Sequence, residues 1–139
     1  MGDFNWGARS IERMSGCHPL LREFANRLIS RSSIDLTIPQ YGGLRTAHEQ
    51  LSIYKTGASR LNGHDRKSYH QTGMAIDIVS AGKTIGVMYD VDRLKYINKV
   101  AKIVWQELVD EDNVGDYEMT FGCDWTRFVD LPHYQIKKR

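Results

Sequence analysis

The stretch Met74-Ala75-Ile76-Asp77-Ile78-Val79 lies near the middle of this 139-residue chain and has the most sheet-like pattern in it. Five of its six residues are apolar, and a short apolar run of this kind predicts a buried β-strand. Asp77 interrupts the run, and a carboxylate is costly to bury unless a partner compensates for it. The stretch therefore predicts a central strand and marks a first candidate for chemistry.

Helical periodicity appears on both sides of this strand. Upstream, residues 19–30 carry apolar side chains at helical spacing and begin with a proline, which suits the first turn of a helix. A second helix is predicted over residues 46–55, ending before Gly57. Downstream, residues 90–110 repeat apolar side chains at intervals of three and four, which predicts the longest helix of the chain.

Short strands complete the predicted fold at residues 35–40, 117–121 and 134–136, and the polar residues 59–71 predict a long exposed loop. No repeat or linker divides the chain, and its length suits one domain. We therefore expect a single α+β domain over residues 1–139, with helices packed on a short, mainly antiparallel sheet.

Charge and composition exclude several classes of function. With 19 basic and 17 acidic residues, the net charge of +2 is too small to favour a nucleic-acid partner. No stretch approaches the ~18 apolar residues of a membrane span, and no apolar signal-peptide core is visible near the N-terminus. Cys17 and Cys123 are too few for a disulfide framework, so we expect two reduced thiols. Membrane insertion is not expected.

Two histidines lie near acidic residues and close to predicted strands. His70 precedes Asp77 by seven residues, with Gly73 between them to allow a tight turn, and His133 follows Asp130 by three. Two imidazoles and a carboxylate form a zinc-type ligand set that leaves a fourth position for water. Spacing alone does not bring His133 to the other pair, and a lone histidine is more often a satisfied core residue than a ligand.

Three motifs in order resemble the zinc D-alanyl-D-alanine carboxypeptidase and L-alanyl-D-glutamate peptidase family. Residues 68–77 (SYHQTGMAID) resemble the family's Ser-x-His-x-x-Gly-x-Ala-x-Asp signature, and residues 130–136 (DLPHYQI) resemble its Asp/Glu-x-x-His element. Residues 42–50 (GGLRTAHEQ) are similar to its Gly-x-Arg-Thr…Gln segment, and residues 4–20 resemble the start of the phage endolysin branch. The likeness covers nearly the whole chain.

The resemblance implies roles residue by residue. It implies a single zinc ion per chain, with three ligands: His70, Asp77 and His133. It makes Asp130 the catalytic carboxylate, which takes a proton from zinc-bound water, and it makes Arg45 a substrate or oxyanion contact. Ser68 is expected to support the metal loop by hydrogen bonding. Asp130 stands where several relatives carry Glu, which favours the endolysin branch.

The function implied by the resemblance is hydrolysis of the L-alanyl-D-glutamate bond of bacterial peptidoglycan by a phage endolysin during host lysis. A D-alanyl-D-alanine carboxypeptidase of the same family remains an alternative. The expected partner is peptidoglycan, and the chain is expected to be a monomeric catalytic domain without a separate wall-binding domain. We expect it to accumulate in the host cytoplasm and to reach the wall after another protein permeabilises the membrane.

Other chemistries are weaker alternatives. A cysteine peptidase would use Cys17 or Cys123 with a histidine. A zinc-stabilised wall-binding module without catalysis would not need the carboxylate of Asp130. An iron oxygenase usually takes ligands as His-x-Asp/Glu rather than seven residues apart.

Two further patterns bear on the site. Residues 110–121 have the spacing of a calcium loop at their start but lack the bidentate Glu at their end, where Phe121 stands. Trp125 lies near the expected site in sequence and is a candidate substrate contact.

Overall fold

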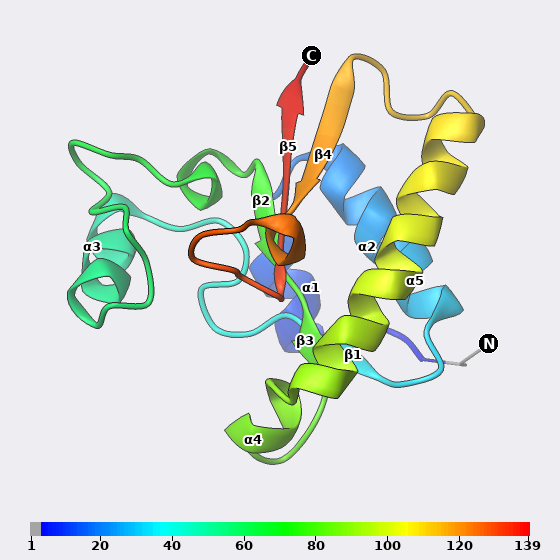
Figure 1. The fold of residues 1–139 in the computed structure, drawn as a ribbon, viewed down its shortest axis with the longest axis horizontal. Coiled ribbons are helices and arrows are strands. Elements are labelled where there is room, and N and C mark those ends of the chain that lie inside the picture. The colour runs from blue at the N-terminus through cyan, green and yellow to red at the C-terminus, as the bar shows by residue number, and fades with distance from the viewer. Residues whose placement is uncertain (1–3) are drawn as a thin grey trace.

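The computed structural model describes residues 4–139 of the chain (Figure 1). Its helices, in chain order, are α1 (Ala8–Met14), α2 (Pro19–Arg31), α3 (Ala47–Lys55), α4 (Ile85–Met88) and α5 (Val91–Asp110). Its strands are β1 (Leu36–Thr37), β2 (Ala75–Asp77), β3 (Val79–Ser80), β4 (Tyr117–Phe121) and β5 (His133–Lys138). Two short 3₁₀ turns complete the fold: η1 (Tyr69–Thr72) and η2 (Gly122–Asp124).

The strands form two small antiparallel sheets. The larger sheet has the order β2-β5-β4, and the smaller one pairs β1 with β3. The predicted α+β class with a short antiparallel sheet is confirmed. β5 is the central strand of the larger sheet, so the C-terminal part of the chain completes it.

The single strand that the sequence predicts over residues 74–79 is divided in two. The backbone N–H of Ile78 donates to the carbonyl of Pro132 (2.9 Å), in register with the β2–β5 ladder, but from Val79 onward the chain pairs with residues 36–37 instead. β2 therefore ends at Asp77 and pairs with β5, whereas β3 pairs with β1. The division leaves Asp77 at the last position of a strand, where its side chain has room for partners.

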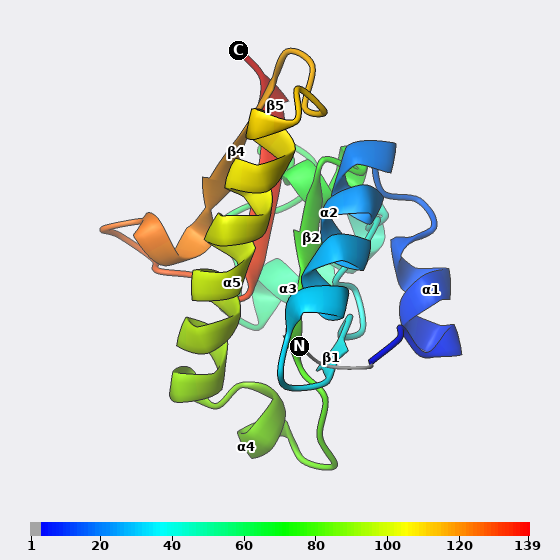
Figure 2. The same cartoon turned by 90° about the vertical axis from the view of Figure 1, so that its right-hand side faces the viewer.

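Helices α2 and α5 lie side by side against one face of the larger sheet, while α3 and the polar loop after it lie on the opposite side (Figures 1 and 2). Phe24 of α2 packs against Tyr134 of β5, with ring centroids 5.4 Å apart, and against Trp105 of α5 at 6.3 Å. The fully buried apolar side chains of this layer come from both helices and the sheet: Leu21, Phe24, Leu28, Ala101, Val104, Leu108, Ile76 and Ile136. This core fixes the positions of β2 and β5.

The predicted helices are confirmed with small shifts at their ends. Thr46 caps α3 in a reciprocal capping box with Glu49, and Asp90 caps α5 through the N–H of Arg93. The predicted strand over residues 35–40 shrinks to two residues, and Pro39 has no N–H to continue it. Helices α1 and α4 were not predicted, and each is too short to show a clear period.

The predicted loop over residues 59–71 is exposed mainly at residues 64–67, whereas Gly63, Ser68 and His70 are buried. Its last residues instead form η1, which carries a buried histidine. None of the helices in residues 4–139 is long and apolar enough to cross a membrane.

Candidate metal centre

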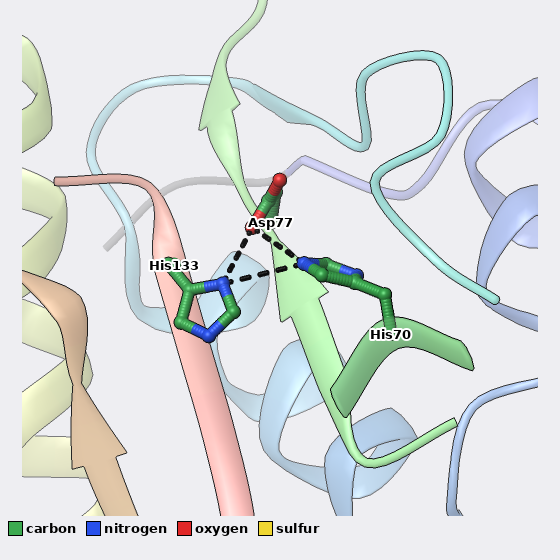
Figure 3. A group of neighbouring side chains, drawn as sticks. All are labelled: His70, Asp77 and His133. Atoms are coloured by element: carbon green, nitrogen blue, oxygen red, sulfur yellow. Dashed lines mark hydrogen bonds and ion pairs between the residues drawn. The ribbon is translucent and has the colours of Figure 1, made fainter. Parts of the chain in front are cut away.

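Three side chains from three elements meet at one point (Figure 3). His70 comes from η1, Asp77 ends β2, and His133 begins β5. In the antiparallel ladder Asp77 stands directly opposite His133, so the register of two strands brings together residues 56 positions apart. Nε2 of His70 and Nδ1 of His133 each lie 3.2 Å from Oδ1 of Asp77, and 3.3 Å from each other.

The backbone around η1 is built to turn His70 back toward the sheet. Oγ of Ser68 accepts a hydrogen bond from the N–H of His70 (3.2 Å) and so caps the turn. Gly73 ends it with φ +74°, a left-handed conformation that favours glycine. A Cβ at Gly73 would also meet the carbonyl oxygen of Gly16. Ser68 therefore lies where the sequence predicts a supporting hydrogen bond.

Hydrogen bonds on the far side of each ring fix how the imidazoles point. Nδ1 of His70 lies 3.0 Å from the carbonyl oxygen of Gly43, which can only accept, so Nδ1 carries the proton and Nε2 presents its lone pair. Nε2 of His133 lies 2.7 Å from Oε1 of Gln135, which leaves its Nδ1 facing the carboxylate. Two ring nitrogens and a carboxylate oxygen thus converge, an arrangement that can hold a metal ion.

The dimensions of this cluster suit zinc. Ligand atoms that lie about 2.0–2.1 Å from a tetrahedral zinc ion are separated from one another by about 3.3–3.4 Å. The three separations in the cluster are 3.2, 3.2 and 3.3 Å. Outer hydrogen bonds from the ligands to a backbone carbonyl and to an amide oxygen are typical of metal-binding histidines. Donor set, size and outer contacts all fit a divalent metal.

The charges of the cluster are strongly coupled. Burial by itself would raise the pKa of Asp77, but the neighbouring His70 and His133 outweigh it and hold that pKa well below its usual range. Burial lowers the pKa of His70. Burial also opposes protonation of His133, yet its hydrogen bond to Asp77 and the charge of that carboxylate raise its pKa. Asp77 is therefore an anion at neutral pH and compensates a cation held beside it.

Arg45 lies against the same carboxylate. Its Nη2 donates to Oδ2 of Asp77 (3.1 Å), its Nη1 to Oε1 of Gln50 (2.9 Å), and its Nε to the carbonyl of Tyr41 (2.6 Å). Gln50 is fully buried and is held in turn by Ser59 and Leu61. The resemblance makes Arg45 a substrate or oxyanion contact, and the structure shows it in a mostly buried ion pair with Asp77 of the cluster.

Asp130 lies beside the cluster without joining it. Its Oδ2 is 3.9 Å from Nδ1 of His133, and it is not one of the three residues whose ligand atoms converge. Its N–H donates to the carbonyl of Gly122 (3.1 Å), and a Cβ at Gly122 would meet the carbonyl oxygen of Asp130. Burial, followed by the charge of Asp77, raises the pKa of Asp130 to about 6. A carboxyl group with such a pKa can both accept and donate a proton near neutrality.

The three residues of the cluster line a cleft of about 690 Å³ together with Arg45 and Asp130. The ring of Trp125 lies against that of His133, with centroids 5.1 Å apart, and Tyr89 and Phe128 also line the cleft. Trp125 had a sequence signal in its nearness to Asp130. Phe128 and Gln135 stand two residues from Asp130 and His133 and were missed although the same signal applies to them, whereas Tyr89 had no signal, because only the fold brings it to the site.

The structure gives less support to the two alternative sites considered from the sequence, a cysteine nucleophile and a calcium loop. Cys17 is 3% exposed, its thiol donates to the carbonyl of Ala75 (3.7 Å), and burial raises its pKa to about 11. Neither cysteine is among the described residues that line the cleft. Residues 110–121 form no cluster of ligand side chains in the described part of the chain and instead turn into β4.

A small α+β domain with two imidazoles and a carboxylate in an open cleft has the ligand set of a catalytic metal site, the kind found in metal-dependent hydrolases. Comparison with known families narrows this class. Residues 1–138 match the model of the phage L-alanyl-D-glutamate peptidase family, and the chain belongs to that family.

Individual proteins similar to this chain carry names of the same peptidase family. The chain is 29% identical over 130 residues to the peptidoglycan L-alanyl-D-glutamate endopeptidase CwlK of Bacillus subtilis, an alignment covering 88% of this chain and 74% of that protein. It is 27% identical over 133 residues to the L-alanyl-D-glutamate peptidase of Listeria phage A118, covering 93% of this chain but only 41% of that protein. The solved structure of the Serratia marcescens L-Ala D-Glu endopeptidase ChiX has the same fold, with a TM-score of 0.75, 24% identity and coverage of 96% and 90% of the two chains.

Proposed function

We propose that this chain is a zinc-dependent peptidase that hydrolyses the L-alanyl-D-glutamate bond of bacterial peptidoglycan. The observation that carries the proposal is the convergence of His70, Asp77 and His133 in the cleft of a chain that belongs to this peptidase family. The names of the relatives support the choice of bond.

The metal would be held by Nε2 of His70, Oδ1 of Asp77 and Nδ1 of His133, the atoms that converge in the cluster. When bound, zinc polarises the scissile carbonyl and lowers the pKa of water at its open position toward ~7. The outer contacts of the two histidines, Gly43 and Gln135, keep the rings oriented for this task.

Asp130 is the group that moves protons in this proposal. It lies in the cleft, close to His133 and outside the ligand set, and its raised pKa of about 6 keeps it basic enough to take a proton from the attacking water. It then returns that proton to the amine that leaves when the amide bond breaks. Its backbone tie to Gly122 fixes its place.

Arg45 and Ser68 support this chemistry in different ways. Arg45 uses one N–H of each Nη group in the contacts to Asp77 and Gln50, so each Nη has a second N–H to offer. Because Arg45 lines the cleft, we assign it to the substrate carbonyl or to the negative charge that develops on it. Ser68 holds the turn that presents His70.

The biological role follows from the phage family and the phage relative. We propose that residues 1–139 form the catalytic domain of an endolysin that acts as a monomer during host lysis. The protein would accumulate in the host cytoplasm and reach the wall after another protein permeabilises the membrane.

Digestion of purified peptidoglycan, followed by mass spectrometry of the products, tests the proposed bond. We expect fragments with new D-glutamate amino termini, formed at least about 100-fold more slowly by the zinc-loaded Asp130→Asn variant. Release of free D-alanine without new glutamate termini would contradict the proposal and identify a D-alanyl-D-alanine carboxypeptidase.

A further inference from the structure

Four cationic side chains line the cleft in addition to the candidate metal centre: Arg60, Arg66, Lys67 and Arg127. None of the four forms an ion pair with a carboxylate in residues 4–139, whereas Arg45, the other arginine of the cleft, is paired with Asp77. The acidic side chains that line the cleft are Asp77 and Asp130, both at the metal centre. The rest of the cleft therefore carries unneutralised positive charge.

The side chain of Arg60 is held in place by an aromatic ring, which leaves its positive charge without a carboxylate partner in residues 4–139. Its guanidinium carbon lies 5.2 Å from the centroid of the Phe128 ring, which is a cation–π distance. Phe128 is 40% exposed and has φ +50°, a left-handed conformation that is strained for a bulky residue. Strain of this kind persists where a site requires it. The contact joins the segment after α3 to the segment before β5, and both residues line the cleft.

Arg127 is tethered close to the reacting bond. It precedes Phe128 and stands three residues before Asp130, and three residues of chain span at most about 11 Å. A substrate whose scissile bond lies at Asp130 therefore places its neighbouring residue within reach of the Arg127 side chain. Arg60, through Phe128, lies at the same part of the cleft rim.

We propose that Arg60 and Arg127 form a subsite for the free carboxylate of the glutamate on the leaving side of the scissile bond, so that the enzyme prefers peptides in which this carboxylate is not amidated. This inference rests on the proposed function. Glutamate has two carboxyl groups, and the peptide chain uses only one of them. The other stays anionic, and a guanidinium can bind it through two parallel hydrogen bonds.

The test compares two synthetic peptides, L-alanyl-γ-D-glutamyl-L-lysine and its glutamate α-carboxamide, by kcat/KM with the zinc-loaded full chain. We expect the acid to be cleaved about 10- to 100-fold more efficiently than the amide, the range of a charged hydrogen bond. The preference should shrink as salt is raised, because the cations are exposed and screened.

Variants assign the preference to the subsite. The double variant Arg60→Gln with Arg127→Gln should bring the acid-to-amide ratio close to 1, mainly through loss of rate on the acid. Arg60→Lys with Arg127→Lys should keep part of the ratio, since the charge remains. Arg9→Gln removes the same charge from an exposed position of α1 that does not line the cleft, and it should leave the ratio unchanged.

The outcomes separate the two proposals. Cleavage of neither peptide would overturn the proposed function. Equal cleavage of acid and amide by the unmodified enzyme would leave that function standing and overturn the subsite. A preference that survives in the Gln double variant would also overturn the assignment to Arg60 and Arg127.

Discussion

The two faces of the larger sheet are built in different ways. On the face covered by α2 and α5, the contacts are apolar, and two ion pairs join α2 to the C-terminal end of α5: Arg27–Glu111 (2.6 Å) and Arg31–Glu107 (2.7 Å). The cleft on the other face holds buried polar groups, a strained Phe128 and unpaired cations. One face supplies stability, and the other holds groups in costly arrangements that chemistry requires.

The paired strands β2 and β5 contribute side chains to both faces. Successive side chains of a strand point to opposite sides, so Ile76, Tyr134 and Ile136 enter the core while Asp77, His133 and Gln135 line the cleft. The packing of the helices therefore sets the geometry of the candidate metal centre through β2 and β5.

Replacing Asp130 by Asn should abolish most of the activity without affecting the helix face, and this is the largest effect that we predict. Asn keeps the shape and the hydrogen bonding of Asp130 but cannot accept a proton at neutral pH, so kcat on peptidoglycan should fall by about 10²–10⁴-fold. The pKa of Asp130 is raised to about 6 in the folded chain, so its charge is disfavoured by folding. The thermal midpoint at pH 7 should therefore stay the same or rise.

Zinc content is the control for this variant. Asp130→Asn is expected to keep its zinc. Turnover near that of the unmodified enzyme would mean that Asp130 only orients the chain before Pro132, and loss of zinc would place Asp130 among the ligands.

Replacing Phe24 by Ala should destabilise the packing of the helix face and, through it, the whole fold. Phe24 is fully buried against Trp105 and Tyr134, so the free energy of unfolding should fall by about 3–5 kcal/mol. Urea denaturation measures this change. Tyr54→Ala removes an aromatic ring that is 44% exposed on α3 and should change the free energy of unfolding by less than about 0.5 kcal/mol. Similar values for the two variants would contradict the division between the faces.

Thiol alkylation should have the smallest effect on activity. Cys17 is buried in the core, and its pKa of about 11 keeps it a protonated thiol at neutral pH; burial also raises the pKa of Cys123. We expect treatment of the folded enzyme with iodoacetamide to leave wall hydrolysis intact, whereas phenanthroline should abolish it. Inactivation by iodoacetamide would instead support a cysteine peptidase.

The elements of the helix face could be predicted from the sequence because their signals are local. The periods of α2 and α5 and the capping residue Asp90 lie within each segment. The division of β2 from β3 could not be predicted, since it depends on a change of pairing partner after Ile78, from β5 to β1, two strands far apart in the chain.

The cleft face required more than periodicity. Spacing suggested His70 and Asp77 as a pair, but only the register of β2 with β5 brings His133 to them, and its assignment before that rested on a resemblance. Gln135 and Phe128 stand two residues from His133 and Asp130, but their spacing alone assigns them no contact. Their roles arise from neighbours that the fold supplies.

The most direct measurement is the zinc content of the purified protein, compared between the unmodified chain and His133→Ala, with circular dichroism to report folding. The account predicts about one zinc ion per chain in the unmodified protein and a large loss in His133→Ala, accompanied by a lower thermal midpoint because site formation is coupled to folding. Asp130→Asn, three residues away, should match the unmodified protein. A folded His133→Ala that retains its full zinc content would contradict the assignment of the metal centre.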